Sequence, residues 1–354
     1  MKKQERIFVI GHKNPDTDSI CSAIAYADIK NRTTQSKRYI PKRAGQINEE
    51  TRYVLNRFGV QPPAYLGNIG TQVKDMDIRL SPQADKNMSL KNTWDLMQEN
   101  GIVSLPIRDK EGCLEGLVTI GDIAKTYMDT TDSYLLSNAR TQYQRIAETV
   151  GGEVVEGNGH GYFVKGRVLV GTANPKMMEE FIEENDMIIM GDREEDHLQA
   201  ISQNVSCIIV GLNIVVSEKV VKLAHEKNIV IIRSPYDTFN IARLINQSIP
   251  VSYVMKRDNM VTFNTEDFTD DIQDVMVKNR HRAFPVINPH GKCIGTISRR
   301  NFLDMHKKKV VLVDHNEVDQ AVDNIEKAEI LEIIDHHKLG TLQTMTPVAF
   351  RNEP

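Results

Sequence analysis

Short apolar runs that end in polar clusters mark both ends of this chain. Ile7–Ile10 and Val310–Val313 are apolar throughout, and Ile330–Ile334 is apolar except for Glu332. Runs of this kind are typical of strands that are buried on both faces of a parallel sheet. We therefore predict that both ends of the chain contribute strands to one parallel α/β domain.

The middle of the chain shows a second alternation of apolar runs and amphipathic stretches. Strands alternating with helices favour a small parallel α/β domain. The predicted strands are Arg167–Val170, Met187–Met190, Cys207–Val210 and Ile229–Ile232, and the predicted helices include Pro175–Glu184 and Glu218–Lys227.

An internal repeat flanks this middle region. Residues 97–122 align without a gap on residues 276–301, at a constant offset of 179. Each copy predicts a helix, a short strand, a turn at a glycine, a second strand and a helix. A unit this small buries little apolar surface alone, so we expect the two copies to pack together. The matched pairs include Met97 with Met276, Pro106 with Pro285, Gly112 with Gly291, Thr119 with Ser298, and Asp122 with Asn301.

Composition excludes several classes of protein. The net charge of −4 gives no sign of nucleic-acid binding. The four cysteines lie far apart without metal-ligand spacing, so we expect buried thiols in a reducing compartment. The apolar run before Gly11 is too short for a signal peptide, and no apolar stretch is long enough to cross a membrane. We therefore expect a cytoplasmic protein without membrane contact.

Residues that could bind a metal or take part in catalysis follow each of the three apolar runs at the two ends of the chain. His12, Asp16 and Asp18 follow the first, Asp314 and His315 the second, and Asp335, His336 and His337 the third. Ligand sites in open α/β sheets form at the carboxyl ends of strands. If the three strands are neighbours, these side chains converge there.

Such a cluster offers imidazole nitrogens and carboxylate oxygens without a thiolate. This donor set suits Mn²⁺, Fe²⁺ or Co²⁺. Asp16 and Asp18 can each serve a different ion, and a metal pair favours in-line phosphoryl transfer. Each segment alone also has a structural explanation. The first is typical of a helix N-cap, the second of a strand-to-loop turn, and the histidine pair of surface or core histidines.

Together, these segments resemble the DHH phosphoesterase superfamily and, within it, the family II inorganic pyrophosphatases. Ala44–Thr51 is also similar to a segment of that family. The resemblance implies that His12 and Asp16 hold one metal, that Asp18 and His336 hold the other, and that Asp314 bridges both. It further implies Mn²⁺ or Co²⁺ as cofactor, Mg²⁺ with the substrate pyrophosphate, and contact of the catalytic His337 with that substrate. Asp335 would orient these groups from outside the metal shell.

The two repeats resemble CBS modules, which commonly bind adenine nucleotides as pairs, and the region between them is similar to a DRTGG domain. The resemblance implies regulation by AMP, ADP or ATP and a homodimer formed through the repeats. Thr119 and Asp122 in one copy, and Ser298 and Asn301 in the other, stand where CBS modules read ribose and phosphate, with Arg299 available for phosphate charge. The alternative is that these residues only pack the repeat interface. The DRTGG signature is reduced to Asp192-Arg193, so the ligand of that region stays open.

These patterns predict a parallel-sheet α/β DHH domain that is split by an inserted pair of CBS repeats around a small DRTGG-like α/β domain. The expected boundaries are 1–66 and 307–354 for the DHH domain, 67–129 and 251–306 for the repeats, and 130–250 for the DRTGG-like domain. The segments Tyr65–Gly70 and His306–Lys309, where the chain leaves and re-enters the DHH domain, should lie close together.

The sequence ends before a further metal-bridging Asp and the cationic C-terminal domain of the resembled family. We therefore expect diphosphate hydrolysis as the function, with little or no activity in this stretch alone. Two alternatives are a nucleotide sensor with a vestigial DHH domain and another DHH phosphoesterase.

Overall fold

The computed structural model describes residues 6–128, 132–172, 179–279, 281–303, 305–340, 342–344 and 346–352. The chain divides into two compact units, which are considered separately here. The first comprises Met1–Ile78, Phe263–His281 and Ile297–Pro354, and the second Arg79–Thr262 and Arg282–Thr296. The second repeat thus contributes residues to both units.

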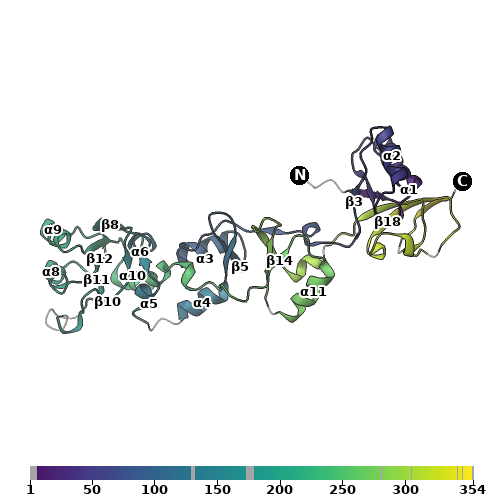
Figure 1. The fold of residues 1–354 in the computed structure, drawn as a ribbon. Helices are drawn as coiled ribbons and strands as arrows, with labels where there is room; N and C mark the ends of the chain where they lie inside the picture. Colours follow the sequence, from purple (N-terminus) through teal and green to yellow (C-terminus); the bar gives the residue numbers. More distant parts are fainter. Residues whose placement is uncertain are drawn as a thin grey trace. The chain divides into compact units, whose positions relative to one another are not determined.

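A six-stranded parallel sheet forms the core of the first unit, and both ends of the chain, purple and yellow in Figure 1, build it. Its strand order is β19-β18-β17-β1-β2-β3, and every neighbouring pair is parallel. The strands are β1 (Ile7–Ile10), β2 (Tyr39–Arg43), β3 (Ala64–Tyr65), β17 (Lys309–Val313), β18 (Glu329–Asp335) and β19 (Ala349–Asn352).

The central strands of this sheet are buried on both faces, as their continuous apolar runs predict. On one face, Val9 of β1 and Val311 of β17 pack with Ala23 and Ala27 of α1 (Thr17–Thr33). On the other face, residues of β1, β17 and β18 pack with the connection between β17 and β18. That second cluster includes Ile10, Val310, Leu312, Ala321, Val322, Ile325 and Ile333.

The second unit contains a five-stranded sheet in the order β10-β11-β12-β13-β8. The predicted parallel strands are confirmed as β10 (Val168–Val170), β11 (Met187–Met190), β12 (Cys207–Val210) and β13 (Val230–Arg233). The predicted helix at 218–227 is confirmed as α9 (Glu218–Glu226), whereas Pro175–Glu184 lies partly outside the described residues. The fifth strand, β8 (Glu153–Glu156), is antiparallel to β13 and was not predicted.

The repeats take the predicted order of elements, with one difference. The first copy runs through α3 (Leu90–Glu99), β5 (Ser104–Arg108), β6 (Leu114–Thr119) and α4 (Ile120–Met128). The second runs through α11 (Thr269–Lys278), β15 (Phe284–Ile287) and β16 (Cys293–Ile297), and then ends in a 3₁₀ turn, η4 (Arg299–Phe302), instead of an α-helix. In the second unit, β16 pairs with β4 (Arg79–Leu80), so strands of the two copies pack together as expected.

The predicted burial of the cysteines is only partly confirmed. In the second unit, Cys207 is buried, whereas Cys113 is partly exposed, so the expectation of buried thiols holds for only some of the cysteines. Within the described residues, no helix has the length and apolar character needed to span a membrane. The remaining elements are α2 (Glu49–Arg57), η1 (Val73–Asp75), α5 (Leu135–Asn138), β7 (Thr141–Gln142), α6 (Tyr143–Thr149), β9 (Tyr162–Phe163), α8 (Glu194–Ser202), α10 (Thr238–Leu244), η2 (Ile245–Ser248), η3 (Val251–Tyr253), β14 (Phe263–Asn264), η5 (Val318–Gln320) and η6 (Ile325–Lys327).

Candidate metal centre

The strand order places a topological switch point between β1 and β17. From there, the chain continues outward through β2 and β3 on one side and through β18 and β19 on the other. Such a switch point leaves a crevice at the carboxyl ends of the strands, where ligands of open α/β sheets bind. The three predicted clusters follow β1, β17 and β18, which are neighbours, so they converge at this crevice.

The segment after β1 is held by a close approach to the start of α1. The backbone N–H of His12 donates to Ser19 Oγ at 3.1 Å, and the N–H of Ser19 donates to Asp16 Oδ1 at 2.9 Å. A Cβ at Gly11 would lie 1.9 Å from Ser19 Oγ, so only glycine fits there. Asp16 is therefore the N-cap of α1, which begins at Thr17.

Asp314 occupies the centre of the cluster. Its backbone is left-handed, with φ 60°, and its side chain is only 4% exposed. One oxygen, Oδ2, lies 3.3 Å from Nε2 of His12, and the other, Oδ1, lies 3.3 Å from Nε2 of His336. The two oxygens of one carboxylate therefore face histidines from two different strands.

The outer carboxylates complete two groups around Asp314. Oδ1 of Asp16 lies 3.8 Å from Nε2 of His12, and Oδ2 of Asp18 lies 3.8 Å from Nε2 of His336. Both carboxylates are mostly exposed, so the crevice is open to solvent on this side. The arrangement consists of two histidine–carboxylate pairs that share Asp314.

This arrangement fits divalent metal ions. Oδ2 of Asp314 is buried and makes no hydrogen bond, which is costly for a carboxylate unless a cation faces it. The nearby carboxylate of Asp314 outweighs burial and raises the pKa of His12, so positive charge is favoured at the position that a cation would take. Among the described residues, the groups around Asp314 offer only imidazole and carboxylate atoms, a set suited to Mn²⁺ or Co²⁺.

Asp335 lies beside the cluster and fixes the histidine pair. Its Oδ1 accepts hydrogen bonds from the backbone N–H groups of His336 and His337 at 2.8 and 3.1 Å, and it lies 2.8 Å from Nδ1 of His337. Burial alone would raise the pKa of Asp335, but these hydrogen bonds and one from Asn316 lower it. The hydrogen bond to Asp335 also raises the pKa of His337, which leaves Nε2 as the free position on that ring.

Asn316 is a structural residue of the site that was not among the predicted metal ligands or catalytic residues. Its Nδ2 donates to Oδ2 of Asp335 and, at 3.1 Å, to the carbonyl of Lys338, while its Oδ1 accepts from the N–H of Gly340. It therefore joins the segment after β17 to the segment after β18. The only sequence signal is its place directly after Asp314-His315.

His315 has a different environment from the other histidines. It is 1% exposed, and its Nδ1 lies 2.9 Å from the carbonyl oxygen of Val313. Burial lowers the pKa of His315, so the ring is neutral near pH 7. The neutral ring donates from Nδ1 to the carbonyl oxygen of Val313, and its buried Nε2 makes no hydrogen bond.

The candidate nucleotide residues form two similar local structures. Asp122 Oδ2 accepts from the N–H and the hydroxyl of Thr119 at 2.9 and 2.6 Å. Asn301 Oδ1 accepts from the N–H and the hydroxyl of Ser298 at 2.7 and 2.9 Å. The guanidinium of Arg299 donates to carbonyl oxygens at the end of α11, those of Met276 and Asn279. Thr119 with Asp122, and Ser298 with Asn301, therefore cap their own turns, whereas Arg299 caps the end of α11.

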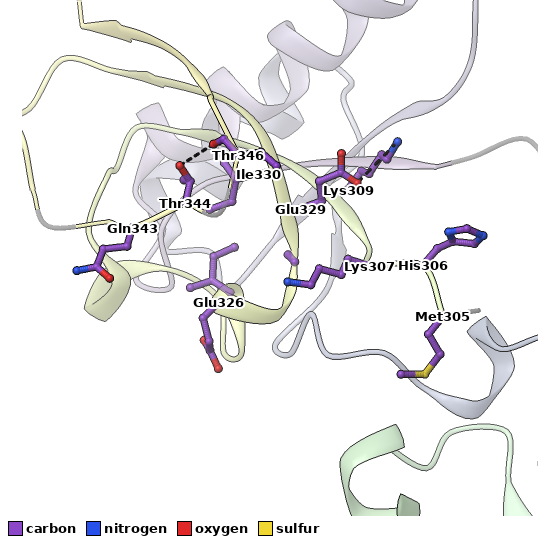
Figure 2. A pocket seen from close by; sticks show the side chains of 12 residues that line it. Met305, His306, Lys307, Lys309, Glu326, Glu329, Ile330, Gln343, Thr344 and Thr346 are labelled. Carbon is purple, nitrogen blue, oxygen red and sulfur yellow. Dashed lines mark hydrogen bonds and ion pairs between the residues drawn. The ribbon is translucent and has the colours of Figure 1, made fainter. Parts of the chain in front are cut away.

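The two segments where the chain leaves and re-enters the outer sheet lie side by side, as predicted. Lys308 Nζ donates to the carbonyl of Gly70 at 2.9 Å and pairs with Asp75 at 3.0 Å. A hollow of about 350 Å³ lies next to the returning segment (Figure 2). Both signs of charge line it, including Lys309 and Glu329 at 3.8 Å, so it favours neither cations nor anions.

Comparisons with known proteins agree with the description of the inserted region and with that of the whole chain. The family model of the CBS domain matches residues 73–129 and 251–308, and that of the DRTGG domain matches residues 145–248. The chain is 40% identical to a cobalt-dependent inorganic pyrophosphatase of Clostridium perfringens over 98% of its length, and 37% identical to a probable manganese-dependent inorganic pyrophosphatase of Thermotoga maritima over 100%. It covers 63% and 64% of the lengths of these two relatives.

A solved structure covers the inserted region. It contains the CBS and DRTGG domains from the regulatory region of the Clostridium perfringens pyrophosphatase, complexed with its activator diadenosine tetraphosphate. Its similarity covers 65% of this chain and 100% of that chain, with 33% identity and a TM-score of 0.61. The chain therefore carries a CBS pair around a DRTGG domain and is, over nearly its whole length, a homologue of the manganese- and cobalt-dependent inorganic pyrophosphatases.

Proposed function

We propose that this chain belongs to an enzyme that hydrolyses inorganic diphosphate to two phosphates and is regulated by adenine nucleotides. The observation that carries the proposal is the position of Asp314, with each carboxylate oxygen 3.3 Å from a histidine of a different strand. The names of the two relatives support the substrate, and their cobalt or manganese dependence supports the cofactor.

We assign one metal to His12 and Asp16, a second to Asp18 and His336, and both to Asp314. Two such ions, Mn²⁺ or Co²⁺, supply the Lewis acidity that phosphoryl transfer requires, and Mg²⁺ would accompany the substrate. Asp314 would be a ligand of both ions, because each oxygen of its buried carboxylate lies 3.3 Å from one of the two histidines.

The catalytic role falls to His337. Asp335 holds Nδ1 of His337 at 2.8 Å, so Nε2 is the position that can reach a phosphate oxygen. Because Asp335 raises the pKa of His337, it favours the protonated ring, whose proton can be donated to the substrate or the leaving phosphate. The side chain of His337 is 54% exposed, which leaves it accessible to a ligand in the crevice.

A metal titration tests the assignment on this chain. Asp314→Asn keeps the size and the left-handed backbone of Asp314, since asparagine tolerates that conformation, but removes the charge. We expect calorimetry with Mn²⁺ or Co²⁺ to show a loss of affinity of at least about tenfold. Asp319→Asn, at an exposed aspartate of η5, should bind metal like wild type. Equal isotherms for Asp314→Asn and wild type would contradict the assignment.

The substrate is tested with the complete protein. We expect phosphate release from pyrophosphate in the presence of Mn²⁺ or Co²⁺, and a loss of release in His337→Gln. Faster hydrolysis of another phosphoester would favour a different DHH phosphoesterase. Metal and nucleotide binding without any hydrolysis would favour a vestigial site in a nucleotide sensor.

Regulation is proposed for the CBS pair, with Thr119, Asp122, Ser298, Arg299 and Asn301 as nucleotide contacts. The activator named for the Clostridium perfringens regulatory region supports an adenine nucleotide as the ligand class. We expect AMP, ADP, ATP or diadenosine tetraphosphate to raise the melting temperature of this chain, because a ligand that binds only the folded state stabilises it. If all four leave the melting temperature unchanged at saturation, the nucleotide assignment fails.

Three further statements stay predictions. These are the homodimer through the CBS repeats, the cytoplasmic location, and little or no turnover of pyrophosphate by this stretch of sequence alone.

A further inference from the structure

A pocket of about 240 Å³ in the second unit combines residues of the first repeat, the DRTGG domain and the segment that leads into the second repeat. Thr119 and Asp122, the candidate nucleotide residues of that unit, do not line it. Two arginines line it together with neutral polar residues, and its lining contains no aspartate or glutamate among the described residues. The arginines are Arg140, just after α5, and Arg145, in α6.

Neither guanidinium has a partner within the part of the chain that the structure describes. No hydrogen bond or ion pair involves the side chain of Arg140, which is exposed, or of Arg145, which is partly buried. Most other arginines of this unit have partners: Arg108 donates to backbone carbonyls, Arg167 pairs with Asp186, and Arg233 pairs with Glu153. Two unpaired guanidinium groups at one pocket leave uncompensated positive charge.

The backbone of Arg140 adds an independent observation. Its φ is 53°, in the left-handed region, and it directly follows Ala139, the C-cap of α5. Glycine or asparagine is the usual residue at such a position, and a long side chain there is disfavoured. The arginine side chain is therefore not explained by the local backbone, and strain of this kind often accompanies a functional role.

We propose that this pocket binds a small anion with a phosphoryl group, held by Arg140 and Arg145. Guanidinium groups match the oxygens of phosphate in charge and in the geometry of their N–H donors. Neutral donors at the rim, including Gln142, Tyr162 and Ser252, complete a site that holds no competing carboxylate. The site is separate from the metal crevice, so it does not depend on the proposed hydrolase function.

Calorimetry of the full chain with inorganic phosphate, pyrophosphate and AMP tests the site, with sulfate as a control oxyanion. The chain is first freed of metal with a chelator, so that the crevice at Asp314 does not take up the anion through metal ions. We expect at least one of the three phosphoryl compounds to bind more tightly than sulfate. Arg140→Gln and Arg145→Gln should each weaken that binding by about tenfold or more. Arg243→Gln, at an exposed arginine outside the pocket, should bind like wild type.

Arg140→Gly separates binding from folding. Because glycine adopts a positive φ without strain, we expect this variant to melt at the same or a higher temperature than wild type while losing anion affinity. The proposal is overturned if none of the phosphoryl compounds binds wild type better than sulfate. It is equally overturned if Arg140→Gly and Arg145→Gln retain wild-type affinity. A loss of AMP binding only in Thr119 or Asp122 variants would assign that nucleotide to the CBS site instead.

Discussion

At the scale of single residues, the proposed metal centre depends on how closely two segments approach each other at Gly11. The hydroxyl of Ser19 occupies the space that a Cβ at Gly11 would need. This contact also fixes the N–H of His12, so the position of the first metal group and the start of α1 are coupled.

Gly11→Ala should therefore disturb both folding and metal binding. An alanine Cβ would lie 1.9 Å from Ser19 Oγ and 3.0 Å from the carbonyl oxygen of Ser19, so α1 must shift together with Asp16 and Asp18. We expect a loss of about 1–3 kcal/mol in the free energy of unfolding, measured by denaturant titration, and weaker Co²⁺ binding.

Two variants serve as controls for this prediction. Ser19→Ala removes the nearest clashing atom, so Gly11→Ala combined with Ser19→Ala should recover part of the loss. Gly191→Ala, where an added Cβ meets no atom within 4 Å, should change the free energy of unfolding by little. The steric explanation is wrong if the single and the double variant are equally destabilised.

The sequence identified the residue types of the site but not their exact geometry. The spacing after each strand was sufficient to bring His12, Asp314 and His336 together once the strands were neighbours. The orientation of Asp314 depends on its left-handed backbone, and nothing in the sequence distinguishes that conformation from an ordinary strand end. The link through Asn316 joins residues 19 apart in sequence, which only the folded structure can show.

At the scale of elements, apolar periodicity predicted the buried strands and missed the exposed ones. β1, β11, β12 and β17 are mostly or fully buried, and their sequences are continuously apolar apart from Lys309 at the start of β17. In contrast, β8 alternates between exposed and partly buried residues, and every residue of β19 is exposed. Edge strands of this kind carry too little apolar surface for a pattern to reveal them.

A polar cluster between α1 and β18 gives a prediction on stability and pH. Glu332 accepts hydrogen bonds from Tyr26 and from Lys30 Nζ, the latter at 2.5 Å, and its side chain is 24% exposed. Burial alone would raise the pKa of Glu332, but the hydrogen bonds from Lys30 and Tyr26 lower it. A carboxyl group with a lowered pKa stabilises the folded state above its unfolded pKa and loses that contribution as pH falls through its folded pKa.

Glu332→Gln should therefore lower the free energy of unfolding by about 1–2 kcal/mol at pH 7, after allowance for partial exposure. The difference from wild type should shrink as the pH falls below the ordinary value of 4.5 toward the lowered pKa of the folded state. Urea titrations at pH 7 and pH 4 measure it, with the exposed Glu326→Gln as control. A difference that stays constant or grows toward acid pH would exclude this origin.

At the scale of the whole molecule, the proposed regulation requires that the inserted region act on the proposed metal centre through the connecting segments of the first unit. Lys308 lies on the returning segment and contacts both Gly70 and Asp75 of the departing one. A second contact joins Lys327 of η6 to Asp270 of α11. β17 begins one residue after Lys308 and ends at Val313, next to the proposed bridging carboxylate.

This path leads to a prediction on coupling. If AMP binding at the CBS pair regulates the enzyme, AMP must change Co²⁺ affinity, and Co²⁺ must change AMP affinity by the same factor. A coupling free energy of about 1–3 kcal/mol corresponds to a factor of roughly 5 to 150. Lys308→Met removes the contacts with Gly70 and Asp75, so we expect this factor to fall toward one while Co²⁺ affinity without nucleotide stays near that of wild type. Lys307→Met, at an exposed neighbour, should keep the full factor.

The measurement is a pair of calorimetric titrations on each variant. One titrates Co²⁺ with and without AMP, and the other titrates AMP with and without Co²⁺. Unequal factors in the two directions would show that the titrations are not at equilibrium, and a full factor in Lys308→Met would place the coupling on a route that does not use Lys308.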